Sequence, residues 1–187
     1  MSTGPSVLRY LDALNVVDPV IIGGCLRSTA LGINRFSDID VALHATPGHG
    51  NEKLFNLLAK KNPAAVDHSK LRKGVLSAQH SLNIGNIPVD LTFFSIAASA
   101  PEKAARARVG ICGLAMDKTG AVWATEAFRR DRDNRTITLL DGTKGDIAPR
   151  VFAYAARLQR DYFPGFAIVD GTADNPSKAV VKRPLVP

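Results

Sequence analysis

The order of apolar and polar positions is most regular in residues 18–44, where two short apolar runs flank a glycine pair. The first run, residues 20–22, ends at Gly23 and Gly24, and a short helix-forming stretch follows. In the second run, residues 38–43, large aliphatic side chains occupy every second position, which is the period expected of a half-buried strand. The pattern predicts a strand, a glycine turn, a short helix and a second strand.

A second regular pattern covers residues 75–94, where two β-rich runs are separated by Gly85 and Asn86. A two-residue loop of this composition is typical of a β-hairpin. Pairing across the loop gives three opposite pairs: Ser81 and Asp90, Gln79 and Thr92, and Leu82 and Val89. One face of the hairpin is then polar and carries Asp90, and the other face is apolar.

Other segments have the spacing of helices. Apolar stripes predict three of them, formed by Val7, Leu11, Leu14 and Val17 in residues 6–17, by Leu54, Leu57 and Leu58 in 51–60, and by Val151, Ala155, Leu158 and Tyr162 in 147–162. Pro101 marks the start of a further helix over 101–109, and a small hairpin is expected over 113–124. The order of elements predicts an α+β fold, in which a mixed β-sheet has helices packed on one face and a small helical appendage follows. We expect a main domain over residues 1–142 and a short helical appendage and tail over residues 143–187.

Asp38 and Asp40 fall on one face of their predicted strand because they are two positions apart. Carboxylates placed in this way repel each other near a core, and a divalent cation removes the repulsion. Mg²⁺, or Mn²⁺ in its place, takes such oxygen ligands. If the hairpin lies beside this strand, Asp90 becomes a third ligand and helps to activate an attacking hydroxyl. The alternative for Asp90 is a polar face in contact with solvent.

The glycine turn has the composition of a phosphate-binding loop. Gly23 and Gly24 let the backbone approach phosphate oxygens closely, and the first amides of the helix carry partial positive charge. Arg27 can bind a triphosphate through two parallel hydrogen bonds, and Ser28 can donate to it or cap the helix. Together with the carboxylates, the turn predicts a nucleoside triphosphate (NTP) as substrate.

On these residues the chain resembles the DNA polymerase beta superfamily of nucleotidyltransferases, in the branch of bacterial tRNA nucleotidyltransferases (CCA-adding enzymes) and poly(A) polymerases. That branch carries Gly-Gly-x-x-Arg-Asp before a helix and Asp-x-Asp on the next strand. The matching residues are Gly23, Gly24, Arg27, Asp38 and Asp40. Ser28 departs from the pattern. The resemblance covers about residues 18–165 and is strongest in 18–44.

The resemblance implies transfer of a nucleotide from an NTP to an acceptor hydroxyl, with release of pyrophosphate. It implies an RNA end, such as that of tRNA, as the acceptor. The branch reads the incoming base with Glu-Asp-x-x-Arg, which is not reproduced around Arg150, so the preferred base does not carry over. CCA-adding enzymes hold tRNA with further helical domains. The predicted helix over 147–162 resembles the neck helix of this branch. Because the chain ends soon after it, we expect a minimal nucleotidyltransferase.

The charge of the chain favours a polyanionic partner. Among 187 residues, 24 are basic and 17 acidic, which gives a formal net charge of +7. Nucleic acid is favoured over membrane because no amphipathic or membrane-spanning stretch accompanies the charge. We expect Arg129, Arg130 and Arg132 to contact RNA phosphates. A basic surface in contact with solvent is the alternative.

Cys25 and Cys112 lie in unrelated segments with no metal-ligand spacing, so neither zinc nor a disulfide framework is indicated. The N-terminal residues lack the pattern of a signal peptide, and no apolar run is long enough to span a membrane. We therefore expect a cytoplasmic protein. Its oligomeric state and its acceptor stay open.

Other functions remain open beside the nucleotidyltransferase. One is a noncatalytic nucleic-acid-binding protein on the same scaffold, although clustered carboxylates weaken binding to a polyanion. Others are a phosphohydrolase with the same metals and a transferase that modifies a small molecule or a protein. His80 is expected to be a hydrogen-bonded core residue. Trp123 and Phe128 either stack on a base or belong to the core.

Overall fold

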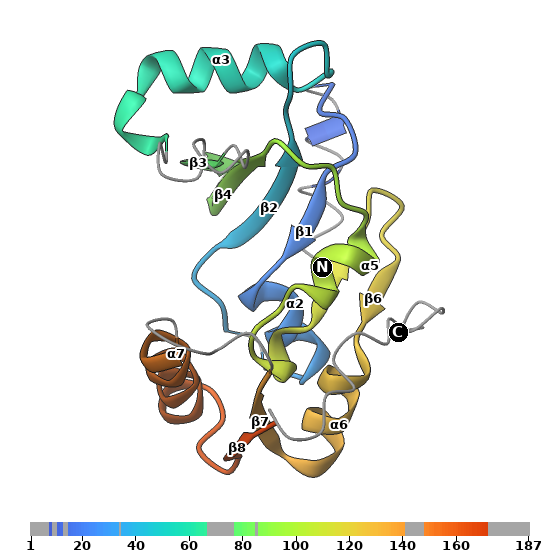
Figure 1. The fold of residues 1–187 in the computed structure, drawn as a ribbon, viewed down its shortest axis with the longest axis vertical. Coiled ribbons are helices and arrows are strands. Elements are labelled where there is room, and N and C mark those ends of the chain that lie inside the picture. The colour runs from blue at the N-terminus through green and yellow to red at the C-terminus, as the bar shows by residue number, and fades with distance from the viewer. Residues whose placement is uncertain are drawn as a thin grey trace.

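The computed structural model describes residues 8, 11–12, 15–33, 35–66, 77–84, 86–140 and 148–171. Its centre is a six-stranded sheet with the strand order β3-β4-β2-β1-β5-β6 (Figure 1). The strands are β1 (Val20–Ile22), β2 (Ile39–His44), β3 (Ser77–Ile84), β4 (Ile87–Phe94), β5 (Leu114–Met116) and β6 (Val122–Ala124). Strands β2 and β4 run parallel, and the other neighbouring pairs in this sheet are antiparallel. The predicted mixed sheet is confirmed.

One face of the sheet carries the main hydrophobic core. Alternate residues of β2 and β4 are buried in it, namely Ile39, Val41, Leu43, Val89, Leu91 and Phe93. Helices α2 (Gly24–Ala30), α3 (Glu52–Lys61), α6 (Glu126–Asn134) and α7 (Ala148–Asp161) contribute apolar side chains to the same core. In Figure 1, α3 lies at one end of the molecule and α6 and α7 lie at the other. A short 3₁₀ helix, η1 (Pro63–Ala65), follows α3.

A fifth helix, α5 (Ala100–Ala105), packs on the opposite face of the sheet, against Val20, Ala42 and Ala115. A capping box formed by Ser99 and Glu102 fixes its start. This helix is shorter than the predicted 101–109. The chain leaves the helix because Val109 is extended and bridges to β7, just before a 3₁₀ helix, η2 (Gly110–Cys112).

A second sheet, absent from the sequence prediction, has two parallel strands, β7 (Thr136–Leu139) and β8 (Ala167–Asp170). Helix α7 lies between these strands in the sequence and contacts both. Its buried residues are Val151, Ala155 and Leu158, as the apolar stripe predicted. The proposed domain boundary between residues 142 and 143 lies outside the described residues.

The hairpin of β3 and β4 has the predicted register. Ser81 pairs with Asp90, and the other two predicted pairs are also present. The small hairpin of β5 and β6 is confirmed as well.

Two helical stripes were wrong in detail. In α3, Leu57 is 52% exposed, and Phe55 instead packs edge-on against Phe93, with 5.5 Å between ring centroids. Near the N-terminus, Val17 is 38% exposed, although Leu11 is buried. Val7 and Leu14 lie outside the described residues. Within the described ranges, no helix has both the length and the apolar character needed to cross a membrane.

Candidate functional site

Two of the three predicted carboxylates lie side by side on the sheet. Strands β2 and β4 pair in parallel, and their register puts Asp40 opposite Asp90. Asp38 comes directly before β2, and all three aspartates are half-buried. Because side chains alternate along a strand, Asp40 and Asp90 point away from the main core, toward the face on which α5 packs. The condition set by the sequence, that the hairpin lie beside the Asp38–Asp40 strand, is met.

The glycine turn is in direct contact with Asp40. Gly23 has φ +84°, a value that L side chains rarely adopt, and a Cβ at this position would collide with Oδ2 of Asp40. The backbone N–H of Gly24 donates to the Asp40 carboxylate. The turn and the carboxylate strand therefore form one unit, in which the absence of a side chain at Gly23 leaves room for Asp40.

Burial and the neighbouring carboxylates both raise the pKa values of groups at this site. Burial raises the pKa of Asp40 from 3.8 to about 6, and the negative charges of Asp38 and Asp90 add to this effect. The charge of Arg27 and the Gly24 N–H oppose it. Burial, followed by the charge of Asp40, also raises the pKa of the Cys25 thiol to about 12. The three carboxylates thus place more negative charge at this site than Arg27 compensates.

Two of the carboxylates have hydrogen-bond donors beside them. Ser37 Oγ donates to Asp38 Oδ1 over 2.8 Å, and Gln79 Nε2 donates to Asp90 Oδ2 over 2.9 Å. In this arrangement, no three His, Cys, Asp or Glu side chains of the described residues are grouped as metal ligands. The chemistry of the donor set still fits Mg²⁺ or Mn²⁺, because both take carboxylate oxygens, and Asp40 lies opposite Asp90 with Asp38 two residues before it.

Arg27 is buried between three elements and is only 3% exposed. Its Nη1 donates to Cys112 Sγ and to the hydroxyl of Tyr154 on α7, each over 3.2 Å. The guanidinium also lies over the rings of Tyr162 and Phe163, 5.5 and 5.7 Å from their centroids. These contacts attach α2 to η2 and α7, an arrangement that the spacing of Arg27 in the glycine motif did not reveal.

Ser28 is fully buried within α2, and its Oγ has no hydrogen-bond partner in the described part of the chain. It does not cap the helix, because α2 begins at Gly24 and Gly23 occupies the N-cap position. Arg27 and Ser28 both line a cavity of about 230 Å³ between α2 and α7. The cavity is lined by Gly24, Arg27, Ser28, Phe36, Ser37, Tyr154, Arg157, Leu158, Asp161 and Tyr162.

The polar residues of α7 in this cavity were missed by the sequence analysis. Tyr154, Arg157 and Asp161 follow one another at spacings of three and four, which puts them on one side of a helix. Arg157 lies over the Tyr154 ring, 5.3 Å from its centroid. The spacing of these three polar residues could have indicated a shared helix face. The sequence analysis considered only the apolar stripe of this helix and therefore treated the helix as a packing element.

The three arginines predicted to contact RNA lie on α6, which contributes no residue to the cavity between α2 and α7. Arg132 is exposed and pairs with Asp133 over 2.7 Å. Arg129 and Arg130 are half-buried, and Nε of Arg129 has no partner among the described residues. None of these arginines thus lines the cavity that Arg27 and Ser28 share.

The aromatic candidates and His80 belong to the core or its edge. Phe128 is fully buried. Trp123 is half-buried, and its Nε1 donates to Asp117 Oδ2 over 3.0 Å. His80 is buried against Phe93, as predicted, but its Nε2 has no hydrogen-bond partner within the described ranges, and burial lowers its pKa.

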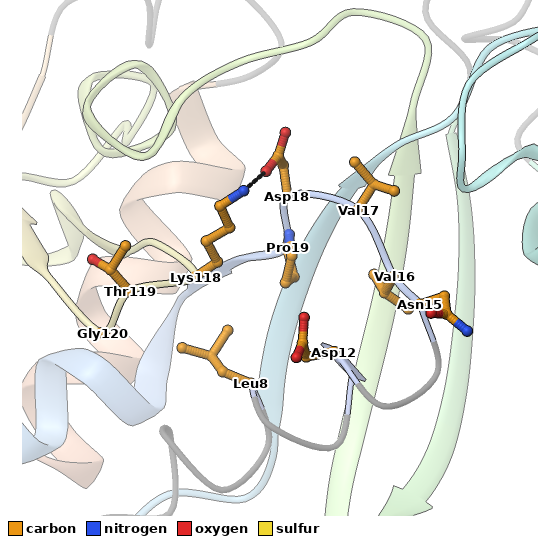
Figure 2. Close-up of a pocket in the computed structure, with 10 residues that line it drawn as sticks. All are labelled: Leu8, Asp12, Asn15, Val16, Val17, Asp18, Pro19, Lys118, Thr119 and Gly120. Atoms are coloured by element: carbon orange, nitrogen blue, oxygen red, sulfur yellow. Dashed lines mark hydrogen bonds and ion pairs between the residues drawn. The ribbon is translucent and has the colours of Figure 1, made fainter.

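A larger cavity, of about 830 Å³, lies between the segment before β1 and the turn that joins β5 and β6 (Figure 2). At its rim Lys118 Nζ pairs with Asp18 Oδ1 over 2.6 Å, and both side chains are 65% exposed. Exposed ion pairs of this kind contribute little free energy. None of Asp38, Asp40 and Asp90 lines this cavity, so size alone does not locate the carboxylate site.

The mixed sheet, its order of elements and the two paired strand carboxylates define a class of fold, the α+β fold of nucleotidyltransferases. No protein-family model matches the sequence, and no curated protein matches it. Solved structures do match, and CCA-adding enzymes and a tRNA nucleotidyltransferase are among them.

Three of these structures illustrate the extent of the likeness. A Thermotoga maritima CCA-adding enzyme complexed with tRNA is 18% identical with a TM-score of 0.56, and the match covers 88% of this chain and 38% of that one. A Bacillus stearothermophilus CCA-adding enzyme in complex with CTP is 18% identical with a TM-score of 0.55, over 88% and 40% of the two chains. A tRNA nucleotidyltransferase complexed with a primer tRNA and an ATP analogue is 18% identical with a TM-score of 0.54, over 87% and 46%.

The chain thus spans less than half the length of these neighbours. The resemblance inferred from the glycine and aspartate motifs is confirmed at the level of the fold, which is that of a nucleotidyltransferase head and neck.

Proposed function

We propose that the protein is a metal-dependent nucleotidyltransferase that moves a nucleoside monophosphate from an NTP to an acceptor hydroxyl. The observation that supports this most strongly is the pairing of Asp40 with Asp90 across β2 and β4, directly beside the Gly23 turn. Carboxylates held next to a turn that can approach phosphates suit an in-line displacement at a phosphate. The fold of the solved neighbours is consistent with this chemistry.

Each part of the site has a separate role in the proposal. Asp38 and Asp40 would hold the divalent cation, Mg²⁺ or Mn²⁺, at the triphosphate, and Asp90 would orient the acceptor hydroxyl beside it. A bound cation supplies charge neutralisation at the phosphates and lowers the pKa of the attacking hydroxyl. The acceptor oxygen would form a bond to the α-phosphate as the bond from the α-phosphate to pyrophosphate breaks, and the hydroxyl proton would pass to water.

The phosphates that leave need donors of their own. The backbone of Gly23 and Gly24, with no side chain in the way, lets phosphate oxygens come close to the start of α2. Ser28 Oγ is a buried donor without a partner among the described residues, and Arg27 supplies positive charge near Asp40. We assign these four residues to the β- and γ-phosphates.

An RNA end is the acceptor that we favour. The net charge of +7 favours a polyanion, and Arg129, Arg130 and Arg132 on α6 are the donors that we assign to its backbone. Solved neighbours include complexes with tRNA and with nucleotides. An alternative acceptor is a small molecule or a protein, and in that case the basic residues are simply a solvated surface.

The test is incubation of the protein with each labelled NTP, total RNA and Mg²⁺ or Mn²⁺. Label transferred to RNA supports the proposal, and Asp40→Asn is the matched control that should lose the transfer. Release of labelled phosphate without transfer indicates a phosphohydrolase. Absence of both, with RNA binding retained, indicates a noncatalytic nucleic-acid-binding protein. Transfer restored by a small molecule or protein in place of RNA identifies the alternative acceptors.

A further inference from the structure

Arg27 presents two ends of one guanidinium group to two different surroundings. Its Nη1 is held by Cys112 Sγ and the Tyr154 hydroxyl, each 3.2 Å away. Its Nη2 faces the glycine turn, because a Cβ built on Gly24 would lie 3.3 Å from this nitrogen. One nitrogen is therefore fixed by the protein while the other borders the turn to which the phosphates are assigned.

The anchor of Nη1 is well defined. The Tyr154 hydroxyl and Cys112 Sγ are 3.6 Å apart, so the two acceptors and Nη1 form a closed set of contacts. Tyr154 is half-buried on α7, and Cys112 is half-buried in η2. The rings of Tyr162 and Phe163 pack on the guanidinium and limit its rotation.

A buried guanidinium needs such partners, because an unpaired charge in this position costs free energy. The guanidinium group of Arg27 is planar. When its Nη1 is held by hydrogen bonds and the aromatic rings limit rotation of the plane, the direction of its Nη2 is fixed as well. A lysine in place of Arg27 would carry all three of its N–H donors on a single nitrogen, so it could not have one nitrogen held by Tyr154 and Cys112 and a second one facing the turn. The geometry thus gives Tyr154 and Cys112 a role toward the glycine turn that acts through Arg27.

We propose that Tyr154 and Cys112 are positioning residues that orient Arg27, so that Nη2 is presented to a phosphate of the NTP at the Gly23–Gly24 turn. This inference rests on the proposed function. It assigns neither residue to the chemical step. Their effect falls on the affinity for the triphosphate, because preorganised donors raise affinity by reducing the cost of ordering on binding.

The test compares Tyr154→Phe and Cys112→Ala with the wild-type protein in two assays. The first is binding of inorganic triphosphate with Mg²⁺ by calorimetry, and the second is the KM for NTP and the kcat of transfer. We expect the Kd and the KM to rise about tenfold, the change that about 1.4 kcal/mol produces, while kcat stays within about twofold. Cys112→Ser keeps a hydrogen-bond acceptor and should restore most of the affinity.

A double-mutant cycle separates positioning from a general loss of structure. In an Arg27→Met background, Tyr154→Phe should have no further effect on the Kd for triphosphate. An equal loss in both backgrounds, or no loss in either, would overturn the inference. Phe152→Leu, on the exposed face of the same helix, is the control and should bind like the wild type.

The two proposals fail in different ways. If the wild type binds triphosphate and the cycle behaves as expected but no nucleotide is transferred, the proposed function fails and the positioning role stands. If transfer occurs and Tyr154→Phe leaves both constants unchanged, only the positioning role fails. A wild type that does not bind triphosphate overturns the positioning role, and the transfer assay then decides the proposed function separately.

Discussion

Replacing Asp40 by Asn should stabilise the protein in the absence of metal. Asp40 has its pKa raised from 3.8 to about 6, so the folded protein holds this proton more tightly than the unfolded chain does. At pH 7 the group is ionised in both states, and the folded state bears the cost of burying its charge beside Asp38 and Asp90. Asn has nearly the same shape and no charge, so the substitution removes this cost.

The size of the effect follows from the shift. At about 1.4 kcal/mol per pKa unit, the shift corresponds to at most about 3 kcal/mol, and screening by solvent at a half-buried carboxylate reduces this to about 1–2 kcal/mol. For a chain of this size, that is an increase in Tm of about 2–8 °C at pH 7. The sign reverses the usual behaviour of an aspartate: the contribution of Asp40 to stability falls as the pH rises from about 4 to 6.

The assay is thermal unfolding by circular dichroism between pH 4 and pH 8, without metal and then with Mg²⁺ and NTP. Asp40→Asn should have the higher Tm above pH 6, and the difference should disappear near pH 4. Added Mg²⁺ with NTP should raise the Tm of the wild type and leave that of the variant unchanged. A lower Tm for the variant at pH 7, or an equal metal-dependent shift in both proteins, would refute this reasoning.

Three further predictions concern other parts of the site. Asp90→Ala should lower kcat by orders of magnitude and change the Kd for NTP only modestly. Steady-state kinetics and a separate binding assay measure the two constants. Loss of NTP binding with kcat retained would contradict the prediction. Gly23→Ala should lower the free energy of unfolding by about 1–3 kcal/mol, because the new Cβ would sit at a positive φ and collide with Asp40. An unchanged free energy of unfolding in a denaturant titration would contradict this prediction. Neutralising Arg129, Arg130 and Arg132 together should weaken RNA binding and flatten its log-log salt dependence by roughly one per lost contact, with NTP binding unchanged. Unchanged RNA affinity and salt dependence in the triple variant would assign these residues to a solvated surface.

The sequence predicted best where a local rule applied. The two-residue loop at Gly85 and Asn86 left one register for the hairpin, and the pairing of Ser81 with Asp90 followed from counting. The contact of β2 with β4 was harder, because it joins segments far apart in the chain, and it entered the prediction only as a condition.

What the sequence did not reveal depends on contacts over long separations. The bond from Arg27 to Tyr154 joins residues 127 positions apart, and the one to Cys112 spans 85. Strands β7 and β8 were missed because they pair in parallel with α7 between them in the sequence, so no short turn marks them as partners. In α3, the three leucines predicted a buried face that included Leu57. Phe55 packs against Phe93 instead, and Leu57 is exposed.

The pairing of Asp40 with Asp90 also has a consequence for folding. These residues are 50 positions apart, and their strands meet only when the chain closes the loop between them. Like charges brought together at that step oppose completion of the sheet. A ligand that requires both carboxylates has no binding site until the strands have met, so it acts by retarding the separation of β2 from β4. A complete complex of cation, NTP and acceptor, which uses both carboxylates, would then protect this chain chiefly by lengthening its lifetime in the folded state.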